Sequence, residues 1–364
     1  MAKDVIVVVN LDSKPKGTES LDILLLSTAG AKDPKIYRSL DEVAVDYPNS
    51  GTTQKIYRKV SALFDQGKTT QADTLIRKVK IAGVATLTGE GDSEKAENLV
   101  EAIETLRETD DDWYILLTDQ DGDEYVKALC AWAEGTEPTE AELGAGVEDH
   151  RKFYFGQTDN KELAVTNRRC ALIYTDTANL DEEADAAYLG NVGPFYPQSV
   201  TWKFKVPQGI TLPDLTQAQR DALEEANVNF LTVEYKQQYV KNGVCCDGEF
   251  IDVQMGADWI AKDMRERLYQ VLLTNPKVPY TDEGFGLVAN AVFQTLNQAT
   301  SLGIIASDPD TGSGVYSVVV PTRAEATDDQ ARARQMPDIT WEAQLEGAVH
   351  SVKVTGTLRA TLTA

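Results

Sequence analysis

The C-terminal third of the chain opens with GEFIDVQMGADWIAKDMRERLYQVLLTNPKVPYTDEGF at residues 248–285. Apolar residues recur at helical spacing over 257–273, Asn275-Pro276 ends that pattern, and Thr281-Asp-Glu is typical of a helix start. The region closes with MPDITWEAQLEGAVHSVKVTGTLRATLTA at residues 336–364, where two alternating strand patterns are separated by Gly347. We therefore expect two long helices followed by strands, the last of which continues to residue 364.

A second terminal strand is predicted at the other end of the sequence, where 4–11 contain a β-branched run and 12–20 have linker composition. A strand tied to its domain by a linker can add to the sheet edge of another molecule. Pairing within its own domain is the alternative, and the residues alone leave both open. We define an N-terminal strand arm with its linker (1–20) and a C-terminal strand arm (348–364). The residues expected to make contacts between subunits are Val5, Val7, Val9, Val352, Val354, Leu358 and Leu362. Gly17 and Gly347 are the expected hinges, because a glycine at a phase shift marks a bulge or bend.

Between the arms, strand and helix patterns alternate. The first part has strand patterns at 21–26, 74–81, 113–118, 153–157 and 168–175, and helix patterns at 50–65, 93–109 and 124–134. A segment rich in Gly, Pro and aromatic residues at 188–198 is expected to end this domain. Strands then follow at 201–206, 228–235 and 316–320, and helices at 214–226, 257–273, 281–302 and 328–334. The pattern predicts an α/β (α+β) chain with two domains, 21–199 and 200–347, in which helices flank the sheets.

The chain has a formal net charge of −23 over 364 residues. Residues 90–149 contain twenty Asp and Glu against three Lys and Arg, a net of −17. This balance argues against nucleic-acid binding, which requires a basic surface. The chain contains no apolar run long enough to cross a membrane and no signal-peptide pattern, so we expect no membrane insertion and folding in the cytoplasm.

Chemical motifs are weak throughout. The four Cys show no C-x-x-C spacing, so reduced thiols are expected, and His350 is expected to be packed or hydrogen-bonded as a structural residue. The sequence Asp119-x-Asp121-x-Asp123 starts like a calcium loop but has Glu124 where Gly is required. We expect no catalytic, cofactor or metal residues. Two alternatives remain: a cytosolic α/β enzyme with a carboxylate site in 90–149, and a binding module that stops at a small oligomer.

Several segments, in order along the chain, resemble the contractile tail sheath proteins of phages and phage-like particles, in the short form found in prophages. They are IYRSLDEVAVDYPNSGTTQKIYRKVSALFDQG (36–67), TWKFK (201–205), DGEFIDVQMGADWIAKDMRERLYQVLL (247–273), NPKVPYTDEGF (275–285) and ARARQMPDITWEAQLEGAVHSVKVTGTL (331–358). The acidic residues 89–146 match least well.

The resemblance implies a structural subunit that is not an enzyme and that stacks as hexameric rings into a helical sheath. The implied partners are a tail tube protein, baseplate proteins and a tail terminator. Terminal arms would add strands to sheets of neighbouring subunits, and contraction would drive the tube through a cell envelope. The subunit would reside in a virion tail or tail-like particle, with 21–199 as its outer domain and 200–347 as its tube-proximal domain. Arg332 and Arg334, in a short helix, are our candidates for residues that face an acidic tube.

Overall fold

The computed structural model describes residues 22–67, 76–139, 141–142, 150–195, 200–351 and 353. Part of the expected site lies outside these residues, namely Val5, Val7, Val9, Gly17, Val352, Val354, Leu358 and Leu362.

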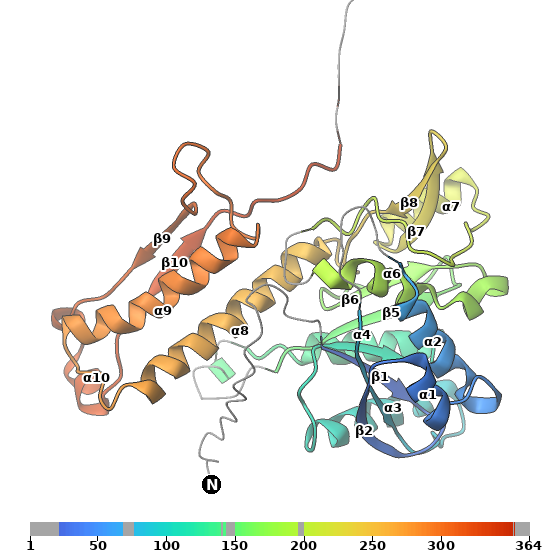
Figure 1. Cartoon of the computed structure of the whole chain (residues 1–364), viewed down its shortest axis with the longest axis horizontal. Coiled ribbons are helices and arrows are strands. Elements are labelled where there is room, and N and C mark those ends of the chain that lie inside the picture. Colours follow the sequence, from blue (N-terminus) through green and yellow to red (C-terminus); the bar gives the residue numbers. More distant parts are fainter. Residues whose placement is uncertain are drawn as a thin grey trace, which may run out of the picture.

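An eight-stranded sheet forms the centre of a first unit, which we define as the described residues from 22 to 250 (Figure 1). Its strands are β1 (Ile23–Ser27), β2 (Lys32–Tyr37), β3 (Val79–Gly83), β4 (Ile115–Thr118), β5 (Phe153–Thr158), β6 (Cys170–Tyr174), β7 (Asn229–Glu234) and β8 (Gln237–Lys241). They lie in the order β2-β3-β1-β4-β5-β6-β7-β8. The six inner strands are parallel and the two edge strands are antiparallel. Every residue of β1, β4, β5 and β6 is buried, which is why these strands read as continuous apolar runs.

Helices cover both faces of this sheet. One face packs against α1 (Leu40–Asp46), α2 (Gln54–Phe64) and α6 (Ala184–Val192). The other packs against α3 (Asp92–Arg107), α4 (Asp123–Gly135) and α7 (Gln217–Glu225). Short 3-10 helices occupy Gly51–Thr53, Thr177–Glu182, Gly193–Phe195 and Arg323–Glu325. The first unit is thus a three-layer α/β domain, as expected from the alternating patterns.

A second unit, residues 251–346, is built on the helix pair α8 (Ile251–Thr274) and α9 (Asp282–Ser301). It also contains α10 (Asp328–Ala333) and a two-stranded antiparallel sheet of β9 (Tyr316–Val319) and β10 (Thr340–Ala343). Helix α8 belongs to both units. Ile251 and Met255 pack in the core of the first unit, whereas Trp259 and Ile260 pack in the separate core of the second.

Two local predictions were wrong. Residues 201–206 form no strand, because the backbone turns at Phe204, whose φ of 64° is left-handed. Much of 188–198 is buried helix rather than a domain boundary, since α6 runs to Val192. The sheet also crosses the expected division at 199/200, because β7 pairs with β6 through Ile173 and Asn229. The boundary between the two units lies instead at the start of α8.

Candidate assembly surface

The sheet of the second unit is largely exposed. The burial of β9 alternates between intermediate and exposed, and three of the four residues of β10 are exposed. Strand β10 pairs with β9 in the register Trp341 with Val318. Within the described residues, no further strand pairs with the opposite edge of β10. This edge therefore offers backbone N–H and C=O groups to an added strand.

An apolar groove of about 580 Å³ lies between α8 and β10. Its lining, apolar apart from Arg265, comprises Ala257, Ile260, Ala261, Met264, Arg265, Leu268, Ile305, Trp341, Ala343 and Leu345. Because the side chains of Ala257 and Ala261 are small, they leave space between this face of α8 and β10. Together the edge and the groove suit strand addition, in which backbone bonds supply affinity and alternate side chains enter a pocket.

After β10 the chain bends and returns to the first unit. Gly347 has a φ of +65°, a conformation that favours glycine, and no atom lies within 4 Å of where its Cβ would be. His350 then lies beside the first unit: its Nε2 is 2.6 Å from the Thr201 hydroxyl, and its ring meets that of Phe250 edge-on at 4.6 Å. Burial and the nearby Lys203 lower the pKa of His350. The structural role expected of His350 is confirmed, whereas hinge motion at Gly347 stays a prediction.

Arg332 and Arg334 lie in and just after α10, at the end of the second unit remote from the eight-stranded sheet (Figure 1). Arg332 is exposed, and its guanidinium lies 3.7 Å from Asp329 of the same helix. Arg334 caps the helix in a left-handed conformation with φ of 57°. Asp328 and Asp329 balance the two arginines, so the helix is not a purely basic surface.

The acidic sequence at 119–123 follows β4, at the sheet edge where α/β enzymes place their sites. Each carboxylate there already has a protein partner. Asp119 accepts hydrogen bonds from Thr28, Asp121 from Lys55, and Asp123 from Asn160. The three carboxylates thus join the segment after β4 to three neighbouring parts of the first unit.

A buried ion cluster beside these residues was missed from the sequence. Lys59 is fully buried, with its Nζ 2.6 Å from Asp185, 3.2 Å from Glu183 and 3.7 Å from Asp121. Burial acts against its charged form, but these carboxylates outweigh burial and raise the pKa of Lys59. The sequence signal was a lysine between Ile56 and Val60, on the apolar face of α2. The cluster joins α2 to α6 and has a structural role.

A second buried ion pair joins the two units through α8. The Arg169 guanidinium donates two hydrogen bonds to Asp258, at 2.7 and 3.0 Å, and the Tyr114 hydroxyl donates a third at 2.7 Å. Asp258 stands on α8 between the residues that enter the first core and those that enter the second. This contact fixes the direction in which α8 leaves the first unit.

Residues 251–358 match the family model described as "E217 tail sheath protein gp31-like, C-terminal domain". The whole fold is similar to the anti-feeding prophage (AFP) baseplate structure, at TM-score 0.65 and 13% identity, covering 98% of this chain and 99% of that one. It is also similar to the AFP helical sheath in its contracted state, at TM-score 0.63 and 14% identity, covering 98% and 99%. The C-terminal region is thus similar to a tail sheath domain, and the overall fold is similar to that of contractile sheath structures. The resemblance predicted from the sequence is thus confirmed.

The family model covers α8, α9 and the β9–β10 sheet, and the structural matches extend over both units. A crystal structure of a sheath tail protein from Listeria innocua is also similar, at TM-score 0.52 and 9% identity, covering 92% of this chain and 97% of that one. No curated protein matches the chain. No helix in the described ranges has both the length and the apolar composition needed to cross a membrane.

Proposed function

We propose that this chain is a structural tail sheath subunit that polymerises around a tail tube and contracts. The observation that carries the proposal is the open edge of β10 beside the apolar groove. A two-stranded sheet gains backbone hydrogen bonds when a strand is added to an unpaired edge. The acidic residues 119–123 are engaged in structural contacts, which favours this non-enzymatic role over a carboxylate enzyme.

The occupants of the edge and groove are, in this proposal, the arms of neighbouring subunits. Val5, Val7 and Val9, or Val352, Val354, Leu358 and Leu362, would place alternate apolar side chains in the groove while their backbones pair with β10. Gly17 and Gly347 would serve as hinges. Because each arm would join a different subunit, the contacts would be individually modest and collectively cooperative. Soluble subunits could then coexist with a stable lattice.

Contraction in this proposal is a change in packing between nearly rigid subunits. Rigidity within the subunit is supported by α8, which enters both cores and is held by Arg169 at the point of passage. The first unit would be the outer part and the second unit the tube-proximal part. The arms would keep neighbouring subunits connected while the units shift.

The proposed assembly is a helical sheath of hexameric rings, with a tail tube protein inside and baseplate and terminator proteins at its ends. The similar structures come from an AFP baseplate and an AFP helical sheath, which supports the sheath and baseplate parts. The assembly would form in the host cytoplasm and reside in a virion tail or tail-like particle.

The test is negative-stain electron microscopy of the purified chain over a range of concentrations, with and without a tube protein. We expect hollow striated tubes from the full chain. Deletion of Met1–Asp12 and the substitution Ala261→Glu, which places a charge in the groove, should each leave a folded monomer that does not assemble. The matched control is Val45→Glu, which changes an 81% exposed side chain on α1 and should assemble normally. Normal tubes from the truncated chain would refute the role of the N-terminal arm. Small uniform particles from the full chain at every concentration would refute the sheath proposal itself.

A further inference from the structure

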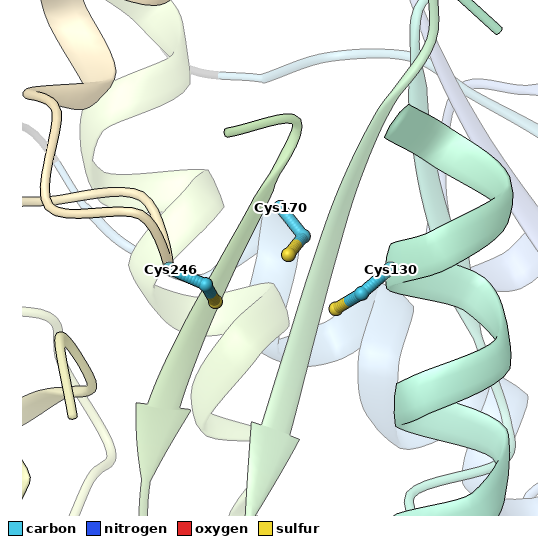
Figure 2. A group of neighbouring side chains, drawn as sticks. All are labelled: Cys130, Cys170 and Cys246. Carbon is cyan, nitrogen blue, oxygen red and sulfur yellow. The ribbon is translucent and has the colours of Figure 1, made fainter. Parts of the chain in front are cut away.

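Three cysteines far apart in the sequence meet in the core of the first unit. Cys130 comes from α4, Cys170 is the first residue of β6, and Cys246 lies between β8 and α8. Figure 2 shows their side chains pointing toward one another from these three elements. The three Sγ atoms all lie within 4.8 Å of one another, and each residue is at most 1% exposed. All three are free thiols.

The spacing of the sulfur atoms is close to that of a thiolate metal site. A tetrahedral zinc ion with Zn–S bonds of about 2.3 Å holds its sulfur ligands about 3.8 Å apart. Small side-chain rotations would therefore close the triangle around an ion. The backbone already holds two of the three positions together, because the Cys246 N–H donates to the Cys170 carbonyl at 3.0 Å.

Binding of a metal ion by these thiols would displace their protons, because thiolate sulfur is the form that coordinates a cation.

We propose that Cys130, Cys170 and Cys246 form a binding site for one soft metal cation, Zn²⁺ or Cu⁺. Thiolate sulfur is the ligand that selects these two ions over hard cations such as Mg²⁺ or Ca²⁺. The ion would tie α4, β6 and the segment that leads into α8 to one point. It would thereby fix the base of the helix that carries the assembly surface. This site involves neither the arms nor the groove, so a negative result for metal binding would leave the proposed sheath function unaffected.

The neighbouring residue supplies a matched control. Cys245 is as buried as Cys246, but its side chain packs in the core on the other face of the sheet, with Ile251 and Met255. Cys245→Ala therefore removes a buried thiol next to the proposed site without removing a ligand. Cys130→Ala and Cys246→Ala each remove one ligand.

The experiment uses the reduced full-length chain, freed of metal with a chelator and titrated without oxygen with Zn²⁺ or with Cu⁺. Bound metal is measured by elemental mass spectrometry after free ions are removed. We expect one ion per chain in the wild type and in Cys245→Ala, with a rise in Tm, and loss of both effects in Cys130→Ala and Cys246→Ala. The preferred ion is the one that the wild type retains when both are offered.

A spectroscopic measurement on the unsubstituted chain covers the case in which a variant fails to fold. Co²⁺ bound by thiolates gives sulfur-to-cobalt charge-transfer absorption, which we expect at one equivalent. Absence of this absorption together with no retained Zn²⁺ or Cu⁺ would overturn the proposal. Equal metal retention by the wild type and all three variants would overturn it as well. In either case the three thiols would act only as small buried apolar groups.

Discussion

The two sheets of this molecule differ in how completely the chain covers them. In the first unit, β1, β4, β5 and β6 are buried at every residue by helices on both faces. In the second unit, β9 and β10 have no fully buried residue. The first sheet is covered by its own chain, whereas within the described residues the second sheet has only two strands. The comparison supports the proposal that the second unit is the part that receives another molecule.

The edges of the two sheets differ in the same way. Edge strand β2 carries Lys32, Pro34 and Lys35 and has a register shift between the two lysines, features that discourage pairing with another strand. At the opposite edge, β8 is covered by the chain at Phe204 and Lys205, which exchange hydrogen bonds with Val240. Strand β10 has the sequence TWEA, without Lys or Pro. The large sheet is thus protected against edge pairing, and the small one is not.

Breaking the joint between the units should have the largest effect on the folded subunit. Asp258→Ala would leave the guanidinium of Arg169, whose side chain is 0% exposed, without its main partner. Removing one partner of a buried ion pair costs about 3–5 kcal/mol. We expect a loss of this size in the free energy of unfolding, measured by urea denaturation of dilute monomer.

The control for this joint is Asp329→Ala, which removes a 95% exposed carboxylate and should change stability by no more than about 0.5 kcal/mol. The double variant Arg169→Met/Asp258→Leu should recover most of the loss, because it leaves no unpaired charge. Equal stability of Asp258→Ala and the wild type would mean that the ion pair does not hold the units together.

The contrast between the sheets can be tested with one side chain from each. Leu25→Ala removes a fully buried side chain from the large sheet and should cost about 2–5 kcal/mol. Trp341→Ala removes a 37% exposed side chain that lines the groove, and should cost the monomer less than about 1 kcal/mol. Assembly should show the opposite order, with Trp341→Ala failing to form tubes under conditions in which it remains folded. Urea denaturation and electron microscopy of both variants check this, and tubes of normal yield from Trp341→Ala would contradict it.

The sequence predicts the covered sheet well because burial on both faces leaves a direct signature. Strands such as β1 and β4 are uninterrupted apolar runs. Helical spacing predicts α8 and α9, although α8 begins at Ile251 rather than at the predicted residue 257. The errors arose where residues that are typical of a boundary or of a strand make tertiary contacts instead. The segment 188–198, rich in Gly, Pro and aromatic residues, suggested a boundary. Its Gly190 instead lies inside α6, where the missing Cβ allows close approach to the Leu63 carbonyl of α2. Residues 201–206 alternate like a strand, yet the chain turns at Phe204.

The candidate surfaces were harder to predict, because they depend on contacts between distant segments. The groove forms because α8 and β10 face each other, and no sequence motif in either element indicates this arrangement. The cysteine cluster unites Cys130, Cys170 and Cys246, whose separations match no ligand spacing. The strand arms, in contrast, stay a prediction from the sequence, and the exposed edge proposed to receive them comes from the structure.

The docking of His350, at the start of the C-terminal arm, should depend on pH. The pKa of His350 is lowered in the folded chain from its usual 6.5, chiefly by burial and also by Lys203. Its docking against Thr201 and Phe250 is therefore fully stabilising above pH 6.5 and weakens as pH falls below it. We expect limited proteolysis near residue 347 to be slow at about pH 7.5 and several-fold faster at about pH 5.5. His350→Gln should remove this pH dependence, and the same acceleration in that variant would assign it to another group.

The smallest effect on the subunit itself is expected at α10. Arg332→Glu/Arg334→Glu changes two exposed side chains, so the free energy of unfolding should stay within about 0.5 kcal/mol of the wild type. If α10 faces an acidic tube, the reversal should raise the concentration of chain needed for assembly on that tube, and more so at low salt. Each exposed ion pair contributes at most about 1 kcal/mol, but the contact repeats in every subunit of a sheath.

The matched control is Lys95→Glu/Lys127→Glu, the same change of charge on α3 and α4 of the first unit, which should assemble on the tube as the wild type does. An unchanged assembly threshold for the α10 variant, measured by co-sedimentation with tubes, would remove α10 from the tube interface. The exposed apolar residues near the end of α8, Leu272 and Leu273, would then be the next surface to test.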